Sequence, residues 1–428
     1  MKGGSRPPTR KVLALVVLGA ILAACTPGAA HPAAGNTTAT LPAIPFKPGS
    51  PWSGALVPLA PPTPVNSLVA VTCATASRCW AVGSTVGSGG APNGAALIAT
   101  TNGGASWVNQ PIPATAAYLS AVACSTPVQC VAVGEGQGNQ GVAIATTNGG
   151  TSWTQASVPA GIGDVTTVTC RSDRRCLAIG SLAAGDAALV STSAGVTWSQ
   201  TGTLSGGTAG ASGVSCVDDQ HCWVTGHTLV GAVQVAGAVV ATANGGTSWS
   251  TIAIPPGSGS LNAVSCVQGP ADQSGSVPGS TAGGQVTVPT QPTSSAPTTT
   301  SPPTAGLAGV RCAVVGTTAT TPNVARIGHG LVFTTANGGA TWASQPAPTS
   351  VAAFFGVWCI GVDTCAAVGS AVASSPTAGV LLFTGSAAKP WKGATTITSP
   401  EPLLGMACTS SSQCVAVGES VIERVAGP

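Results

Sequence analysis

The feature that most constrains this chain is a pair of cysteines, separated by five residues, that recurs along its length. Six such pairs occur, and a seventh has a long insertion in place of the short spacer. The second cysteine is typically followed by a short apolar run that ends in glycine, as in CWAVG and CVAVG. Repetition of one unit indicates a fold in which similar units stack on one another. The pairs are Cys73/Cys79, Cys124/Cys130, Cys170/Cys176, Cys216/Cys222, Cys266/Cys312, Cys359/Cys365 and Cys408/Cys414.

The cysteine count predicts the redox state of these pairs. The chain has 15 cysteines, so seven pairs leave Cys25 without a partner. Such complete pairing is typical of proteins in an oxidising compartment. We predict that each pair forms a disulfide across a β-hairpin, because facing Cα atoms of a hairpin come within disulfide range.

A second repeat lies in register with the cysteines. The segment TTNGGASW at 100–107 recurs in related form at 146–153, 191–198, 242–249 and 335–342. It resembles the Asp-box, or BNR repeat, in which a polar side chain caps a turn, glycine supplies a positive φ, and tryptophan fills the gap beside the next sheet. The resemblance assigns these roles to Asn102, Gly104, Trp107, Asn148, Gly150, Trp153, Ser193, Gly195, Trp198, Asn244, Gly246, Trp249, Asn337, Gly339 and Trp342.

The period of the repeat predicts the fold. Successive first cysteines are 51, 46, 46 and 50 residues apart, then 93 across the insertion, then 49. This length fits the four-stranded blade of a β-propeller. We therefore predict an all-β, seven-bladed propeller of four-stranded antiparallel blades, with one disulfide in the hairpin of the first two strands. We call the strands A to D from the inside outward, and in the second unit expect them at 119–124, 130–134, 141–147 and 152–158.

The two ends of the chain are expected to meet in one blade. Cys414 lies too close to the end of the sequence at Pro428 for a complete last unit. We predict that the stretch around 46–56 supplies the missing outer strand and closes the ring. The propeller then covers 46–428, with a disordered Ser/Thr/Pro-rich insertion at 267–310.

The N-terminus resembles a bacterial lipoprotein leader. Residues 1–24 combine a basic start with a short apolar run, which is typical of a signal peptide. The run ends in Leu-Ala-Ala before Cys25, which resembles a lipobox whose cysteine is lipidated. We predict export, a lipid anchor at Cys25 on the outer face of a bacterial cell membrane, and a flexible tether at 25–45.

Composition limits the function. Only 6% of the residues are charged, and four of the 14 lysines and arginines lie within the first 11 residues. A nucleic-acid partner is therefore not expected, because its recognition needs many more positive charges. We also expect no cofactor and no metal, because the cysteines are paired and no Cys/His spacing resembles a metal site.

Asp-box propellers include sialidases and the photosystem II assembly and stability factor-like proteins. The resemblance implies that ligands bind at the D–A and B–C loops, away from the Asp-box turns. There, the residue after each B-strand glycine occupies an equivalent position, and we predict Glu135, His227 and Glu419 as candidate binding residues. The full set is Ser84, Glu135, Ser181, His227, Thr317, Ser370 and Glu419.

The residue inventory argues against a sialidase. That chemistry needs three converging arginines and a tyrosine nucleophile. This chain has one tyrosine, Tyr118, and most of its arginines fall in A–B loops. Those loops carry charges of both signs at 171–175 and 218–221, which we expect to pair with each other.

The predicted function is a non-catalytic module that binds or assembles a protein partner on the cell surface. The alternative is a cell-surface glycan-binding protein, or a glycoside hydrolase that is not a sialidase, with cell-wall glycan as the partner. We predict no catalytic residues.

Overall fold

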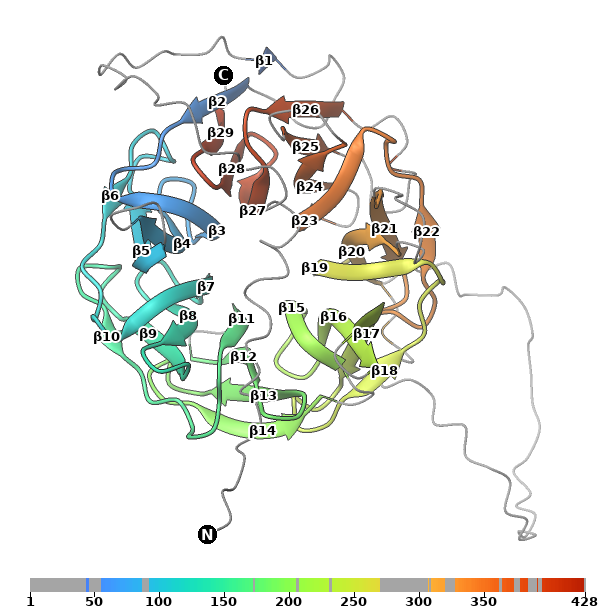
Figure 1. Cartoon of the computed structure of the whole chain (residues 1–428), viewed down its shortest axis with the longest axis horizontal. Helices are drawn as coiled ribbons and strands as arrows, with labels where there is room; N and C mark the ends of the chain where they lie inside the picture. Colours follow the sequence, from blue (N-terminus) through green and yellow to red (C-terminus); the bar gives the residue numbers. More distant parts are fainter. Residues whose placement is uncertain are drawn as a thin grey trace, which may run out of the picture. The chain divides into compact units, whose positions relative to one another are not determined.

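Seven antiparallel sheets form the fold, and no helix occurs among the residues that the structure describes. This computed structural model describes residues 44–45, 55–86, 92–171, 174–204, 208–230, 233–269, 307, 309–319, 328–361, 364–372, 378–383, 391 and 395–426. All of them belong to one unit, Leu41–Pro428. Within it the sheets are arranged as blades around a common centre (Figure 1). The seven-bladed propeller predicted from the repeats is confirmed.

Each blade runs outward through four strands. The inner A strands are β3 (Val65–Cys73), β7 (Ala116–Cys124), β11 (Val165–Cys170), β15 (Thr208–Cys216), β19 (Ser258–Gln268), β23 (Val351–Gly361) and β27 (Leu403–Ser410). The B strands are β4 (Cys79–Val86), β8 (Cys130–Gly136), β12 (Cys176–Ser181), β16 (Cys222–Val230), β20 (Val310–Thr318), β24 (Thr364–Ala371) and β28 (Gln413–Gly418). We number the blades 1 to 7 in the order of these A strands.

The outer half of each blade is formed by strands C and D. The C strands are β5 (Pro92–Thr100), β9 (Gly141–Thr146), β13 (Asp186–Ser191), β17 (Val233–Thr242), β21 (Gly330–Thr335), β25 (Gly379–Phe383) and β29 (Ile422–Ala426). The D strands are β6 (Val108–Asn109), β10 (Thr154–Gln155), β14 (Ser199–Thr203), β18 (Ser250–Ile252), β22 (Ala343–Gln345), β26 (Thr395–Ser399) and β2 (Ala55–Leu59). The D strand predicted at 152–158 is only two residues long, because the turn extends to Trp153 and Ser157 already pairs with Thr197 of the next blade.

The N-terminal strand closes the ring, as predicted. Strand β2 pairs with β29 along its whole length, from Ala55 opposite Ala426 to Leu59 opposite Ile422. The predicted position around 46–56 was too early by several residues. A two-residue strand, β1 (Ile44–Pro45), adds a fifth strand outside β2.

All seven predicted disulfides are present, and each joins strands A and B of one blade. Their Cα atoms lie 4.0–4.1 Å apart, including those of Cys266 and Cys312, which are 46 residues apart in sequence. The pairing of β19 with β20 continues beyond this disulfide to Gln268 and Val310. Both ends of the predicted insertion thus belong to strands.

Eleven of the 14 cysteines in disulfides are buried, and Cys365 is among the most deeply buried of them. It lies opposite Cys359 in the pairing of β23 with β24 and is bonded to it, as predicted. Its side chain is 0% exposed, within a core cluster that also contains Phe354 and Trp391. The pairing also continues past this disulfide, so that β24 begins one residue before Cys365 rather than at the cysteine. Cys365 therefore stabilises blade 6 and cannot contact a ligand or partner.

A β-bulge explains the glycine that ends the apolar run of each B strand. Every A strand has a β-bulge where it pairs with strand B. The shift in register always includes the fourth residue before the A-strand cysteine. In five blades the bulged backbone brings a carbonyl oxygen against the glycine, so that a Cβ atom there would clash, as at Gly83 with Ser67 and at Gly134 with Tyr118. Only glycine allows so close a backbone approach.

The turns between strands C and D have the hydrogen bonds that their sequence predicts. In blade 1, Thr100 Oγ1 donates to Asn102 Oδ1 at 2.8 Å and accepts from the Gly104 amide at 3.0 Å. The Asn102 oxygen also accepts from the Ser106 amide, and Gly104 has a φ of 84°. Trp107 is buried against its neighbours, only 8% exposed. Equivalent bonds occur at Thr146, Ser191, Thr242 and Thr335.

Several predictions concern residues outside this description. Cys25, the signal peptide at 1–24 and most of the insertion at 267–310 lie there, as does the tether at 25–45 apart from Ile44 and Pro45. Within the described ranges, no helix has the length and apolar character needed to cross a bilayer.

Candidate functional site

The propeller has two ends with different chemistry. The A–B and C–D connections leave at one end, which we call the disulfide face. The D–A and B–C connections leave at the other end. We call it the glutamate face, because the four glutamates of the chain, Glu135, Glu401, Glu419 and Glu423, all lie in strands or loops at that end.

Charge separates strongly between these ends. Asp164 and Asp186 join the four glutamates on the glutamate face, and no arginine or lysine among the described residues lies there. The described arginines belong to the disulfide face. They are Arg78, Arg171, Arg174 and Arg175 in A–B loops, Arg311 at the start of β20, and Arg424, whose side chain reaches the Gly104 turn of blade 1. An acidic end of this kind attracts cationic groups.

The predicted ring of residues after the B-strand glycines is present but uneven. Glu135 and Glu419 are partly exposed, whereas His227 is only 8% exposed. Burial lowers the pKa of His227, so its imidazole is neutral at pH 7. The three candidate residues stand in blades 2, 4 and 7, and the structure does not bring them together. The two glutamates are the accessible members.

Glu135 belongs to a local cluster at the junction of blades 2 and 3. Its backbone pairs with Tyr118 across β7 and β8. Asp164, at the start of the next A strand, lies close enough that Glu135 raises its pKa in addition to the larger effect of burial, to about 6. The Asp164 carboxylate accepts a long hydrogen bond from Ser120, at 3.5 Å. Burial and the Asp164 charge in turn raise the pKa of Tyr118, so its hydroxyl keeps its proton.

A second pair of carboxylates lies in blade 7. Burial, and then the charge of Glu401 in the preceding D–A loop, raise the pKa of Glu419 above its ordinary range. Like charges that lie close together without a cation are unfavourable, and a bound cationic group removes that cost. The face therefore has two places, at Glu135–Asp164 and Glu401–Glu419, where a positive charge is electrostatically favoured.

Two other acidic groups on this face act inside the fold. Asp186 is 3% exposed, and its Oδ2 accepts a hydrogen bond from the Ala211 amide of blade 4 at 3.0 Å. Burial raises its pKa to about 6. Glu423 is 4% exposed and accepts a hydrogen bond from Ser399 of blade 6 at 2.9 Å. Both join neighbouring blades, and the sequence analysis missed both because nothing in the sequence marks which acid a neighbouring blade covers.

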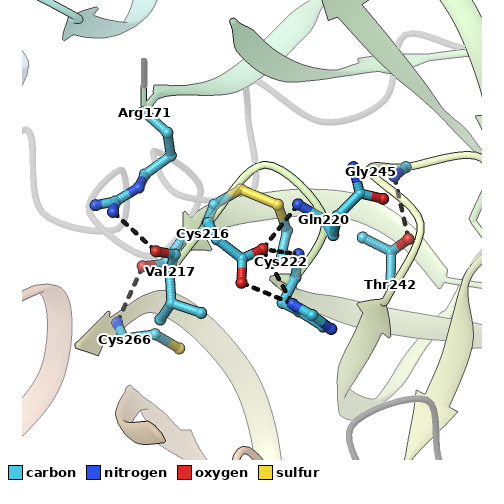
Figure 2. The surroundings of a disulfide bond; sticks show 12 residues. Arg171, Cys216, Val217, Gln220, Cys222, Thr242, Gly245 and Cys266 are labelled. Atoms are coloured by element: carbon cyan, nitrogen blue, oxygen red, sulfur yellow. Dashed lines mark hydrogen bonds and ion pairs between the residues drawn. A yellow bond between two sulfur atoms is a disulfide. The ribbon is translucent and has the colours of Figure 1, made fainter. Parts of the chain in front are cut away.

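The expected pairing between the two charged A–B loops was wrong for Arg171. Its Nη2 donates to the Val217 carbonyl at 2.8 Å, and no ion pair joins it to Asp218 or Asp219 (Figure 2). The Asp218 carboxylate instead pairs within its own loop, where it lies 2.8 Å from His221 Nδ1. Asp173 lies outside the described residues. Backbone acceptors thus compete successfully for an arginine that the sequence suggested would find a carboxylate.

Within the described residues, no group of three or more His, Cys, Asp or Glu side chains is placed to hold a metal ion.

Comparisons with known proteins bear on the fold. No protein-family model matches the chain, and a search of curated proteins finds no match.

Solved structures do match. One described as "YCF48 bound to D1 peptide" shares 13% identity with a TM-score of 0.55, over 90% of this chain and 98% of that one. A GH74 enzyme from Niastella koreensis shares 10% identity with a TM-score of 0.50, over 84% of this chain and 52% of the enzyme, so this chain spans about half its length. U3-55K shares 10% identity with a TM-score of 0.50, over 86% and 98%. At these identities the likeness shows the propeller fold.

Proposed function

We propose that this protein is an exported lipoprotein, anchored through Cys25 to the outer face of a bacterial cell membrane, whose propeller binds a partner protein through the glutamate face. The turns between strands C and D are, in this proposal, Asp-box folding devices at the opposite end. The partner contributes a cationic segment, which interacts with Glu135 and Glu419.

The observation that carries this proposal is the separation of charge. In a chain where 6% of residues are charged, six of the eight described carboxylates lie at one end, and the described arginines lie at the other together with Asp218 and Asp219. Complementary charge across an interface increases the rate of association and selects the partner. A protein of similar fold, YCF48, has been captured with a bound peptide, which supports a binding role for such a propeller.

The test is in-cell crosslinking of the full chain, followed by mass spectrometry of the proteins that co-purify. Wild type is compared with the Glu135→Gln/Glu419→Gln variant, which keeps the side-chain size and removes both charges. Arg174→Gln, at an exposed position of the disulfide face, is the control. We expect a stoichiometric protein partner with wild type and control that is lost with the double variant. A partner captured equally by all three proteins would contradict the assigned face.

A glycan-binding or glycoside hydrolase function is the second candidate. It is favoured by one observation, that burial and then the charge of Glu135 raise the pKa of Asp164 to about 6, since glycoside hydrolysis uses a carboxyl group of raised pKa as its acid beside a second carboxylate. The GH74 enzyme of similar fold adds support. Absence of a protein partner, together with retention on cell-wall polysaccharide, would move this candidate to first place. Reducing-sugar release, lost in Asp164→Asn, would identify a hydrolase.

A further inference from the structure

The disulfide face carries an unusual concentration of charge at one point. The A–B loops of blades 3 and 4 read RSDRR and VDDQH, and together contain six of the charged residues of the chain. The same hairpin is made elsewhere from STPVQ at 125–129 and TSSSQ at 409–413. Their disulfides have the same Cα separation of about 4.0 Å. Folding of the hairpin therefore does not require these charges.

Three of these charged residues, Arg171, Asp218 and Asp219, line an open cleft between the two loops. Arg171 lies on one side, and Val217, Asp218, Asp219 and Gln220 lie on the other. The cleft is shallow and open to solvent, with a volume of about 420 Å³. It lies beside the Cys216–Cys222 disulfide, where Figure 2 shows Arg171 reaching toward the Val217 backbone.

The charged side chains of the cleft are fixed by hydrogen bonds rather than by an ion pair between Arg171 and the aspartates. Arg171 Nη2 is held by the Val217 carbonyl at 2.8 Å. The Asp218 carboxylate accepts from the amides of Gln220 at 2.8 Å and His221 at 2.7 Å, as well as from the His221 ring. Burial alone would raise the pKa of Asp218, but these hydrogen bonds outweigh it and hold the pKa below its ordinary value, so the group stays ionised. Side chains fixed in place before binding lose less entropy when a ligand arrives.

Asp219 completes the acidic side of the cleft. Its side chain is exposed, and no described residue donates a hydrogen bond to its carboxylate. A guanidinium and carboxylates that line the same open cleft favour a ligand that carries charges of both signs in the complementary order. The guanidinium binds a carboxylate by paired N–H donors, and the carboxylates bind an ammonium or guanidinium group.

We propose that this cleft is a second binding site, for a short peptide segment that carries an acidic and a basic side chain. Arg171 binds the acidic side chain, and Asp218 and Asp219 bind the basic one. The site is independent of the proposed function, because it lies at the other end of the propeller and uses none of the residues of the glutamate face.

The experiment is a titration of the ¹⁵N-labelled protein, disulfides intact, followed by chemical shifts of backbone amides. The probes are Ac-Glu-Lys-NH₂ and Ac-Lys-Glu-NH₂, with Ac-Glu-Gln-NH₂ and Ac-Gln-Lys-NH₂ as singly charged controls. We expect saturable shifts in loops 171–175 and 216–222 with at least one doubly charged peptide, and about fivefold to tenfold weaker binding of the singly charged ones, as loss of a charge-assisted contact implies.

The variants separate a binding role from a structural one. Arg171→Gln and Asp219→Asn are each expected to weaken binding about fivefold to tenfold. Arg78→Gln is the matched control, because Arg78 Nη1 likewise donates to a carbonyl of the next blade, that of Pro127 at 3.3 Å, beside a loop without charges. Binding unchanged in Asp219→Asn, an equal loss in Arg78→Gln, or no saturable shift up to the solubility of the peptides would overturn the proposal. Asp219 is exposed, so its variant keeps the test valid if Arg171→Gln fails to fold.

Discussion

Asp186 gives the sharpest test of how polar groups join the blades. This carboxyl group is 3% exposed and accepts its hydrogen bond from the Ala211 amide of the next blade. Burial raises its pKa from 3.8 to about 6 in the folded protein. A folded-state pKa above that of the unfolded chain means that folding favours the protonated form. Stability from this group is therefore complete below about pH 4 and is lost as the pH rises to about 6.

The size of the effect follows from the pKa difference. A tenfold change in proton affinity corresponds to about 1.4 kcal/mol. The rise of the Asp186 pKa to about 6 therefore lowers the free energy of unfolding by about 3 kcal/mol once the group is ionised. About 2.5 kcal/mol of this loss falls between pH 4 and pH 8. Asp186→Asn removes the titration and keeps an oxygen that accepts from Ala211. Any cost of burying the new amide protons is the same at both pH values, and so cancels in the difference.

The assay is guanidinium chloride unfolding of wild type and Asp186→Asn at pH 4 and pH 8, with disulfides intact. Between the two pH values, the free energy of unfolding of the variant should rise relative to wild type by about 2.5 kcal/mol. Asp219→Asn, an exposed carboxylate, is the control. A relative change below about 0.5 kcal/mol, or one of opposite sign, would refute the reasoning.

Three other perturbations test the bonds that hold the propeller together. Replacing Cys266 and Cys312 by serine should lower the free energy of unfolding by about 4 kcal/mol, against about 2.2 kcal/mol for Cys124 and Cys130, because loops of 46 and 6 residues differ in closure entropy. Equal losses in denaturant titrations would contradict this. Asn262→Ala should cost about 1–3 kcal/mol by removing the bond from Asn262 Nδ2 to the Phe354 carbonyl of blade 6, and Asn109→Ala, whose exposed bond reaches Thr63, should cost less than half as much in the same assay. Removal of residues 1–59 deletes β2 and should lower the free energy of unfolding by about 3 kcal/mol or more, because several backbone hydrogen bonds are lost at about 1 kcal/mol each. Removal of residues 1–43 keeps β2 and is the control. Similar unfolding midpoints for both truncations would show that the strand does not close the ring.

Much of the fold could be predicted from the sequence, because two marks recur at a fixed spacing. Cysteines define the A–B hairpins and the Thr–Asn–Gly turns define the C–D connections, so blade number, strand order and disulfide pairing followed directly. The A-strand bulge could not be predicted. It occurs at Val69, Ser120, Thr166, Ser212, Asn262, Phe355 and Leu404, and no single residue type is common to these positions. Only their constant distance from the cysteine marks them.

The candidate site was predicted less completely. Glu135 and Glu419 are partly exposed where the repeat placed them, but the carboxylates that interact with them, Asp164 and Glu401, lie in D–A loops whose sequences do not repeat. The burial of His227 depends on its neighbours in space, which a position in the repeat does not specify. Contacts between blades join residues far apart in sequence, so local patterns carry little information about them.

The central claim, that partners bind at the glutamate face, is tested most directly by a photo-crosslinking amino acid placed at single positions of the full chain in cells. Positions 135 and 419 sample the glutamate face, and positions 128 and 174 sample the disulfide face, where Val128 is 45% exposed. The account predicts one protein adduct shared by positions 135 and 419 and absent from the other two. The same adduct formed from 128 and 174, with none from 135 and 419, would contradict it.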